Sequence, residues 1–303
     1  MRPGGPLGPL AMLRRLPGGL PLAMISRAAH PAGDIRRIVM DSALARVPLL
    51  LGPDAPAPDL REIGAVPLMT PATVAELDLR PEPEALRAGL HPKWRNRLGH
   101  AERQGVRVAR EVPDGSARHW LFRAEAEMQA RRGYRTWPLT LILAYGAVNP
   151  GHCVNFTARE RGETVAAMLF LRHGGAATYQ IGQTSARGRA LSAHTLLLWE
   201  AMLWLRTEGH GRLDLGPIDM QRGAGLARFK LGTGAELRRL GGTWGWWPPL
   251  GRRSRWSSPR APQRGPRGAV TTRPRTRTTP ASRSSGRESS SAPSCRGMRS
   301  RAR

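Results

Sequence analysis

The chain has 303 residues, of which 48 are basic and 22 acidic, giving a formal net charge of +26. Hydrophobic residues make up 40% of it, enough for a core, and its length suits one large domain or two of ordinary size. Two cysteines, Cys153 and Cys295, are too few and too scattered for a disulfide framework or a zinc site, so we expect a cytoplasmic protein without a bound metal.

The first 80 residues alternate short apolar runs with prolines and glycines. Residues 10–16 and 20–26 flank Pro17-Gly18-Gly19, which predicts two strands joined by a turn. The prolines also interrupt the continuous apolar segment that a signal peptide requires, so export is not expected, and no transmembrane helix is expected either. We expect residues 1–80 to form a small, partial N-terminal α+β lobe.

Helical patterns begin after residue 82. Two helices are expected between residues 84 and 105, and Trp94, Leu98 and Ala101 give the second one an apolar face. Two more helices and then three strands joined by tight hairpins are expected at residues 116–132, 140–147, 152–159, 164–172 and 176–182.

Three cations of the second helix, Lys93, Arg95 and Arg97, lie outside its apolar face. Such a group forms either a solvated surface or a binding site for an anionic ligand, and both readings stay open.

The stretch from residue 176 to residue 233 predicts a βαβ unit. A strand (178–182) leads into a small basic loop (183–190), a long apolar helix (192–208) and a second strand (212–215). Backbone N–H groups and the dipole at the start of such a helix favour a bound phosphate. The residues expected to hold it are Ser185, Arg187, Gly188, Arg189, Ala190, Leu191 and Ser192. The local pattern alone slightly favours an ordinary surface loop with a serine cap, because loops of small residues before helices are common.

Four stretches together resemble the GNAT acyltransferase superfamily. They are His91-Pro-Lys-Trp-Arg-Asn-Arg-Leu with the following Ala101-Glu-Arg-Gln-Gly, the strand and loop from Tyr179 to Gly188, the apolar helix with the following Leu213-Asp-Leu-Gly-Pro-Ile-Asp, and Gly225-Leu-Ala-Arg-Phe-Lys-Leu-Gly-Thr-Gly. The last is similar to a Gly-Leu-x-x-Phe-Lys-x-Gly-Phe-Gly signature, with Thr233 where an aromatic residue is common. Within the superfamily the chain resembles the FemAB-like branch, which includes peptidoglycan aminoacyl transferases and acetyltransferases linked to polysaccharide synthesis.

The resemblance covers roughly residues 60–245 and implies a GNAT-like mixed α/β fold with a splayed central sheet flanked by helices. It implies an N-acyltransferase that uses acyl-CoA (acetyl-CoA) or an aminoacyl-tRNA as donor, with no metal. The implied acceptor is an amine on a small molecule or on a cell-wall or polysaccharide precursor. In this reading residues 81–250 form the acyltransferase domain.

Direct attack of an amine on an acyl carbonyl relies on juxtaposition and on groups that stabilise the tetrahedral oxygen. No Gly-x-Ser-x-Gly motif or Cys–His pair is evident, and Cys153 is expected in a core strand. The resemblance implies Lys230, Phe229 and Asp219 as catalytic candidates. It implies candidates for binding the acceptor or the donor phosphates at Lys93, Arg95 and Arg97, and a further substrate-side candidate at Tyr179. Asp214 and the lone His194 are more simply read as structural.

The last residues, 251–303, contain arginine, serine, threonine, proline and glycine with almost no aliphatic side chains, which predicts disorder. Residues 252–303 hold fifteen arginines and one acidic residue, Glu288. That composition also suits a frameshifted reading of a high-GC gene. Two alternatives to an enzyme remain open: a basic nucleic-acid-binding protein and an inactive, truncated family member.

Overall fold

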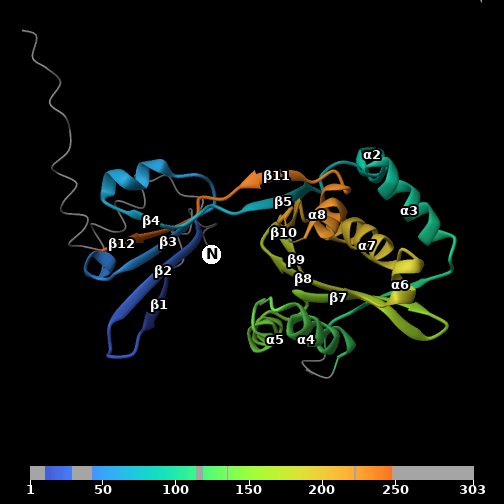
Figure 1. Ribbon diagram of the computed structural model, residues 1–303, viewed down its shortest axis with the longest axis horizontal. Coiled ribbons are helices and arrows are strands. Elements are labelled where there is room, and N and C mark those ends of the chain that lie inside the picture. Colours follow the sequence, from blue (N-terminus) through green and yellow to red (C-terminus); the bar gives the residue numbers. More distant parts are fainter. Residues whose placement is uncertain (1–10, 29–42, 114–118, 135, 222, 248–303) are drawn as a thin grey trace, which may run out of the picture. The chain divides into compact units, whose positions relative to one another are not determined.

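The computed structural model describes residues 11–28, 43–113, 119–134, 136–221 and 223–247. Its strands form two sheets, of five and seven strands (Figure 1). The tail expected to be disordered lies outside the described residues.

The five-stranded sheet has the order β1-β2-β3-β12-β4. Its members are β1 (Ala11–Arg15), β2 (Pro21–Ala28), β3 (Leu49–Pro53), β4 (Val66–Met69) and β12 (Thr243–Trp246), accompanied by the short 3-10 helices η1 (Ala43–Arg46) and η2 (Pro58–Ile63). The expected hairpin around Pro17-Gly18-Gly19 is present as β1 and β2. The core of this sheet includes Trp244 and Trp246, which lie near the C-terminal end of the described residues.

The seven-stranded sheet has the order β11-β5-β10-β9-β8-β7-β6. Its strands are β5 (Thr73–Asp78), β6 (Arg107–Glu111), β7 (Cys153–Glu160), β8 (Glu163–His173), β9 (Ala176–Thr184), β10 (Arg212–Pro217) and β11 (Glu236–Arg239). The two sheets do not divide at residue 80, where the N-terminal lobe was expected to end. Strand β5 precedes residue 80 but belongs to the seven-stranded sheet, and β12 follows it but belongs to the five-stranded sheet.

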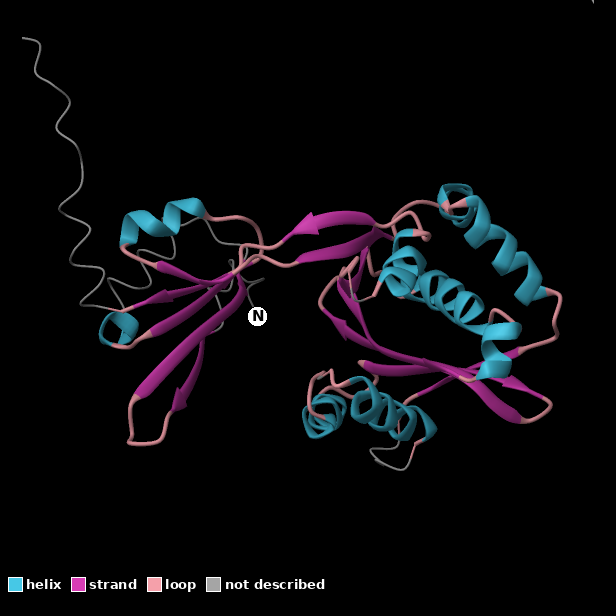
Figure 2. Cartoon of the chain, viewed as in Figure 1, coloured by secondary structure: helices cyan, strands magenta, loops and turns pink. Residues whose placement is uncertain are grey.

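Helices cover both faces of the seven-stranded sheet (Figure 2). They are α2 (Pro83–Gly89), α3 (Pro92–Glu102), α4 (Trp120–Arg132), α5 (Leu139–Val148), α6 (Ala186–Ala190), α7 (Ala193–Thr207) and α8 (Ala224–Leu231). Side chains of β8 alternate between the faces: Met168 and Phe170 join the core under α3 and α7, whereas Leu169 and Leu171 join the core under α4 and α5. The expected mixed α/β class is confirmed.

The sheet splays between its parallel strands β9 and β10. The two strands pair only from Arg212 to Asp214 against Ala176 to Thr178, although β9 continues to Thr184 and β10 to Pro217. Each strand also has a bulge near the point of separation, at Gln180 against β8 and at Leu215 against β5. The βαβ unit and its splayed sheet are therefore present as expected.

One local expectation was wrong. The segment expected to be an open loop, 183–190, contains the end of β9 and the short helix α6. Ser185 caps α6, since its Oγ accepts a hydrogen bond from Gly188 N at 3.1 Å. Gly188 packs so closely on β8 that an added Cβ would lie 2.3 Å from the carbonyl oxygen of Val165.

Candidate functional site

Lys230 is a buried cation at the end of β10. It lies on α8 with 5% of its surface exposed, and its Nζ donates a hydrogen bond to the carbonyl oxygen of Pro217 at 3.0 Å. Burial lowers the pKa of this ammonium to about 8, and the nearby charge of Asp214 opposes the shift. Lys230 can therefore change its charge near physiological pH.

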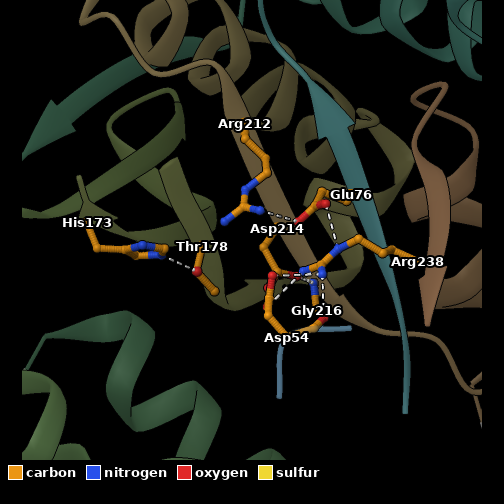
Figure 3. Close-up of polar contacts among 8 residues, drawn as sticks. All are labelled: Asp54, Glu76, His173, Thr178, Arg212, Asp214, Gly216 and Arg238. Atoms are coloured by element: carbon orange, nitrogen blue, oxygen red, sulfur yellow. Dashed lines mark hydrogen bonds and ion pairs between the residues drawn. The ribbon is translucent and has the colours of Figure 1, made fainter. Parts of the chain in front are cut away.

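The end of β10 brings polar backbone groups close to Lys230. Gly216 has a φ of 81°, and a Cβ at this residue would lie 3.5 Å from Lys230 Nζ. The buried Asp214 accepts a hydrogen bond from Gly216 N at 2.7 Å, which stabilises the bulge (Figure 3). Gly216 and Pro217 still pair with β5, and the carbonyl oxygen of Pro217 also accepts the hydrogen bond from Lys230 on α8.

Polar side chains also occupy the face of β5, β9 and β10 shown in Figure 3. Glu76 lies between Arg238 Nε at 2.7 Å and Arg212 at 3.4 Å, and Arg238 also pairs with Asp54 at 3.0 Å. A cavity of about 830 Å³ includes Glu76, Arg212 and Arg238 in its lining. These opposite charges pair with one another, so the face is balanced rather than strongly cationic.

Phe229 joins α8 to α3 and α7. Its ring centroid lies 6.0 Å from that of Trp94 and 6.1 Å from that of His194, and its carbonyl oxygen accepts a hydrogen bond from Trp94 Nε1 at 3.1 Å. A Cβ on Gly232 would lie 2.6 Å from the Trp94 ring, so this glycine permits the close contact. The first and fourth stretches that carried the family resemblance thus pack on one another.

The residues expected to hold donor phosphates lie around α6, and many of their polar groups bond within the protein. Arg187 pairs with Glu160 at 2.7 and 2.5 Å, and Arg189 Nη1 donates to the carbonyl oxygen of Thr184 at 3.0 Å. Ser185 and Gly188 bond to each other, Leu191 is buried, and Ser192 has a left-handed φ of 55°. The carbonyl oxygen of Ala190 accepts a hydrogen bond from His100 Nε2 at 3.2 Å. The two guanidiniums are the exposed cations of this set.

The cations of α3 differ from one another. Arg95 donates to the carbonyl oxygens of Ala88 and Leu90 at 2.9 and 3.0 Å, where it caps the end of α2. Lys93 and Arg97 are exposed. The structure thus places Arg95 in a helix-capping contact and leaves the other two side chains on the surface.

Tyr179 and Asp219 lie in different surroundings. Tyr179 packs on Phe170 with ring centroids 5.8 Å apart, and burial raises its pKa. Its hydroxyl lies over Gly182, where a Cβ would be 2.0 Å from it. Asp219 is exposed and accepts a hydrogen bond from Gln221 N at 2.9 Å. The buried carboxylate whose charge acts on Lys230 is Asp214.

Sequence reasoning missed a buried carboxylate on α4. Glu125 is 6% exposed and accepts hydrogen bonds from Gln183 Nε2 at 2.6 Å, Gln129 Nε2 at 3.1 Å and the Tyr134 hydroxyl at 3.1 Å. Gln183 also lines a cavity of about 350 Å³ together with Trp120 and other residues of α4. Glutamates are ordinary on helices, so no sequence signal marked this one.

Comparison with known proteins agrees with this geometry. Residues 92–231 match the family model described as an acetyltransferase (GNAT) domain. This stretch is therefore similar to a GNAT acetyltransferase domain. This range includes α3, the splayed strands, α7 and α8.

Solved structures extend the likeness beyond that range. The crystal structure of FemX has a TM-score of 0.66 at 13% identity, covering 78% of this chain and 83% of that one. The C-terminal domain of a putative lysylphosphatidylglycerol synthetase from Agrobacterium fabrum has a TM-score of 0.50 at 16% identity, with coverage of 78% and 83%. The fold of this chain is thus similar to the folds of FemX and of this synthetase domain. A sequence search of curated proteins finds no match.

Among the residues that the structure describes, no group of three or more histidine, cysteine, aspartate or glutamate side chains is arranged to hold a metal ion. None of the helices that the structure describes combines the length and apolar character needed to cross a membrane.

Proposed function

We propose that this GNAT domain transfers an acyl or aminoacyl group from a thioester or ester donor to an amine by direct attack. The observation that carries the proposal is the buried Lys230 ammonium at the end of β10, where the sheet has splayed. In GNAT-type transfer no covalent enzyme intermediate is required, which fits a site without a protein nucleophile.

The proposed reaction begins when a neutral amine attacks the carbonyl carbon. A C–N bond forms, and the carbonyl electron pair moves to the oxygen. Lys230 donates a hydrogen bond to that oxygen, and Phe229 borders the reacting group. The C–S or C–O bond then breaks, the carbonyl re-forms, and the proton lost by nitrogen leaves with the thiol or alcohol product. Asp219 was the sequence-based candidate for receiving that proton, but its side chain is exposed, and a buried acceptor is proposed in its place below.

Donor recognition is proposed on the side of α6. Acyl-CoA and aminoacyl-tRNA both carry phosphates, and exposed Arg187 and Arg189 offer guanidiniums to them. Arg187 would exchange its contact with Glu160 for a phosphate oxygen. Lys93, Arg97 and Tyr179 are proposed on the acceptor side, with a small molecule or a cell-wall or polysaccharide precursor as the acceptor.

The test uses the full chain in single-turnover transfer assays, with acetyl-CoA and an aminoacyl-tRNA as separate donors and a panel of amines. We expect Lys230→Met to lower the transfer rate by about 10²–10³-fold, the usual loss of one oxyanion donor, with donor binding nearly unchanged. Lys230→Arg should retain part of the rate because it keeps the charge.

The matched control is Arg239→Ala, which removes an exposed cation of β11 outside the proposed site and should leave the rate unchanged. Transfer that is equally fast in the wild type and in Lys230→Met would overturn the assigned role of Lys230. A wild-type chain that transfers no acyl group from either donor would contradict the proposed function itself.

A further inference from the structure

His194 carries a buried polar atom that has no partner. It lies in the first turn of α7, and its Nε2 is shielded from solvent without a hydrogen bond. Buried polar atoms in folded proteins almost always have a partner. An unpaired Nε2 within a candidate active site therefore points to a group that arrives with the substrate.

Four elements surround this imidazole. Its ring centroid lies 6.1 Å from that of Phe229 on α8, and backbone carbonyls of Gln183 on β9 and Ala167 on β8 interact with it. The positive charge of Arg189 on α6 interacts electrostatically with the ring. The ring thus lies between the last part of β9 and the helix that follows β10, which are the two sides of the splay.

We place the ring proton on Nδ1, so that Nε2, which has no partner, keeps its lone pair. Burial lowers the pKa of His194 to about 4. The charge of Arg189 acts in the same direction and the two carbonyls act against it, so the ring is neutral at pH 7.

We propose that His194 is a further catalytic residue, whose Nε2 accepts the N–H proton of the attacking amine. The proposal rests on the acyl-transfer function proposed above. As the C–N bond forms and the amine nitrogen becomes positively charged, Nε2 takes one proton from it. The imidazolium returns that proton to the departing sulfur or oxygen as the C–S or C–O bond breaks, and the neutral ring is restored.

The proposed role of His194 explains why its Nε2 is buried without a hydrogen-bond partner. A neutral imidazole with a bare lone pair costs stability in the free protein, and the cost is relieved when an N–H group binds. The weakly basic ring holds the proton only briefly, which suits a relay between the amine and the leaving group.

The test compares His194→Phe and His194→Gln with the wild type in the full chain. His194→Phe keeps a planar ring beside Phe229 without the nitrogens, so the unfolding temperature and donor binding should remain within the range of the wild type. Its single-turnover rate should fall by about 10²–10⁴-fold, the usual contribution of a general base. His194→Gln should recover part of that rate, because its side-chain oxygen can accept the N–H hydrogen bond.

His152→Gln, at an exposed histidine before β7, is the control and should transfer at the wild-type rate. ¹⁵N spectra of the imidazole rings provide a readout independent of turnover: His194 should be neutral at pH 7 with an unprotonated Nε2. A protonated Nε2, or wild-type rates in His194→Phe, would overturn the role of His194 and leave the acyl-transfer proposal intact. Absence of transfer by the wild type from either donor would overturn both.

Discussion

Lys230 combines a charge with a buried position, and this combination has a measurable consequence for stability. Its pKa in the folded protein is about 8, below the usual value of 10.5, because burial disfavours the charged form. Between these two values the unfolded chain binds more protons than the folded one at this residue. The contribution of Lys230 to the free energy of unfolding therefore rises as the pH increases from about 8 to about 10.5.

Lys230→Met tests this linkage. Below pH 8 both states of the wild type are protonated, so the difference in free energy of unfolding between wild type and variant should be constant. Above pH 8 it should change in favour of the wild type, by about 1.4 kcal/mol per pH unit at most. Urea unfolding at pH 7, 8, 9 and 10 measures the difference. A difference that stays constant up to pH 10 would show that the ammonium is not held in an unfavourable environment.

Replacing the buried Glu125 should destabilise the protein more than replacing the exposed Glu127 on the same helix. Glu125→Ala removes the acceptor for Gln129, Tyr134 and Gln183, and should reduce the free energy of unfolding by about 1–3 kcal/mol. Glu127→Ala on the exposed side of the same helix should change it by less than about 0.5 kcal/mol. Chemical denaturation of both variants checks the prediction, which equal losses would contradict.

For individual residues, the sequence indicated which side chains could take part in the chemistry but not how buried they are or what they contact. Lys230 was conspicuous as one of two lysines, yet its burial depends on the bulged end of β10. His194 was read as structural because a lone histidine in a helix carries no pattern. Glu125 was invisible because Gln183, which binds it, is 58 residues away along the chain. Long-range contacts of this kind leave no local periodicity.

Among the elements, α6 gives the sharpest prediction. Gly188→Ala would place a Cβ 2.3 Å from the carbonyl oxygen of Val165 and 2.5 Å from Thr184 Oγ1, so α6 must shift from β8. We expect a loss of about 1–3 kcal/mol, the usual cost of overpacking. Gly89→Ala at the end of α2 meets no atom within 4 Å and should be neutral or stabilising by up to about 1 kcal/mol. Thermal unfolding of the pair compares them directly, and a Gly188→Ala variant as stable as Gly89→Ala would contradict the close packing.

The same helix shows where element prediction succeeds and where it fails. The hairpins of β7, β8 and β9 and the long helix α7 followed from apolar runs bounded by turn residues, and they were predicted within a few residues. The five residues of α6, Ala-Arg-Gly-Arg-Ala, contain a glycine that local propensity treats as a helix breaker. The serine cap and the contact of Gly188 with β8 outweigh that propensity, and neither is visible in a short window of sequence.

At the scale of the whole molecule, substitutions of Trp246 and Trp247 test how strongly β12 stabilises the five-stranded sheet. Trp246 is 4% exposed and its Nε1 donates to the carbonyl oxygen of Ile63 at 2.9 Å, whereas Trp247 is 51% exposed. Trp246→Ala should lower the free energy of unfolding by about 3–5 kcal/mol, as for other large core residues. Trp247→Ala should have little effect, and urea unfolding distinguishes them. Similar losses in the two variants would be inconsistent with a buried β12.

The division of the chain into sheets was the least predictable feature. The sequence indicated a change of character near residue 80, and β5 through β11 do lie in one sheet. It did not indicate that Thr-Trp-Gly-Trp at residues 243–246 pairs with β3 and β4, whose partner residues lie 174 to 197 positions earlier in the chain. Four residues are too few to show an alternating pattern, and only the formed sheet identifies their partners.

The position of β12 has a consequence for biosynthesis. Strand β12 lies between β3 and β4 and is translated after every other described strand. The five-stranded sheet therefore begins to be synthesised first and can be completed only last. While the ribosome makes the intervening domain, the facing edges of β3 and β4 remain without their partner. Nascent chains arrested before residue 243 should therefore bind chaperones that recognise open strand edges, and chains arrested far enough beyond residue 247 to clear the exit tunnel should release them.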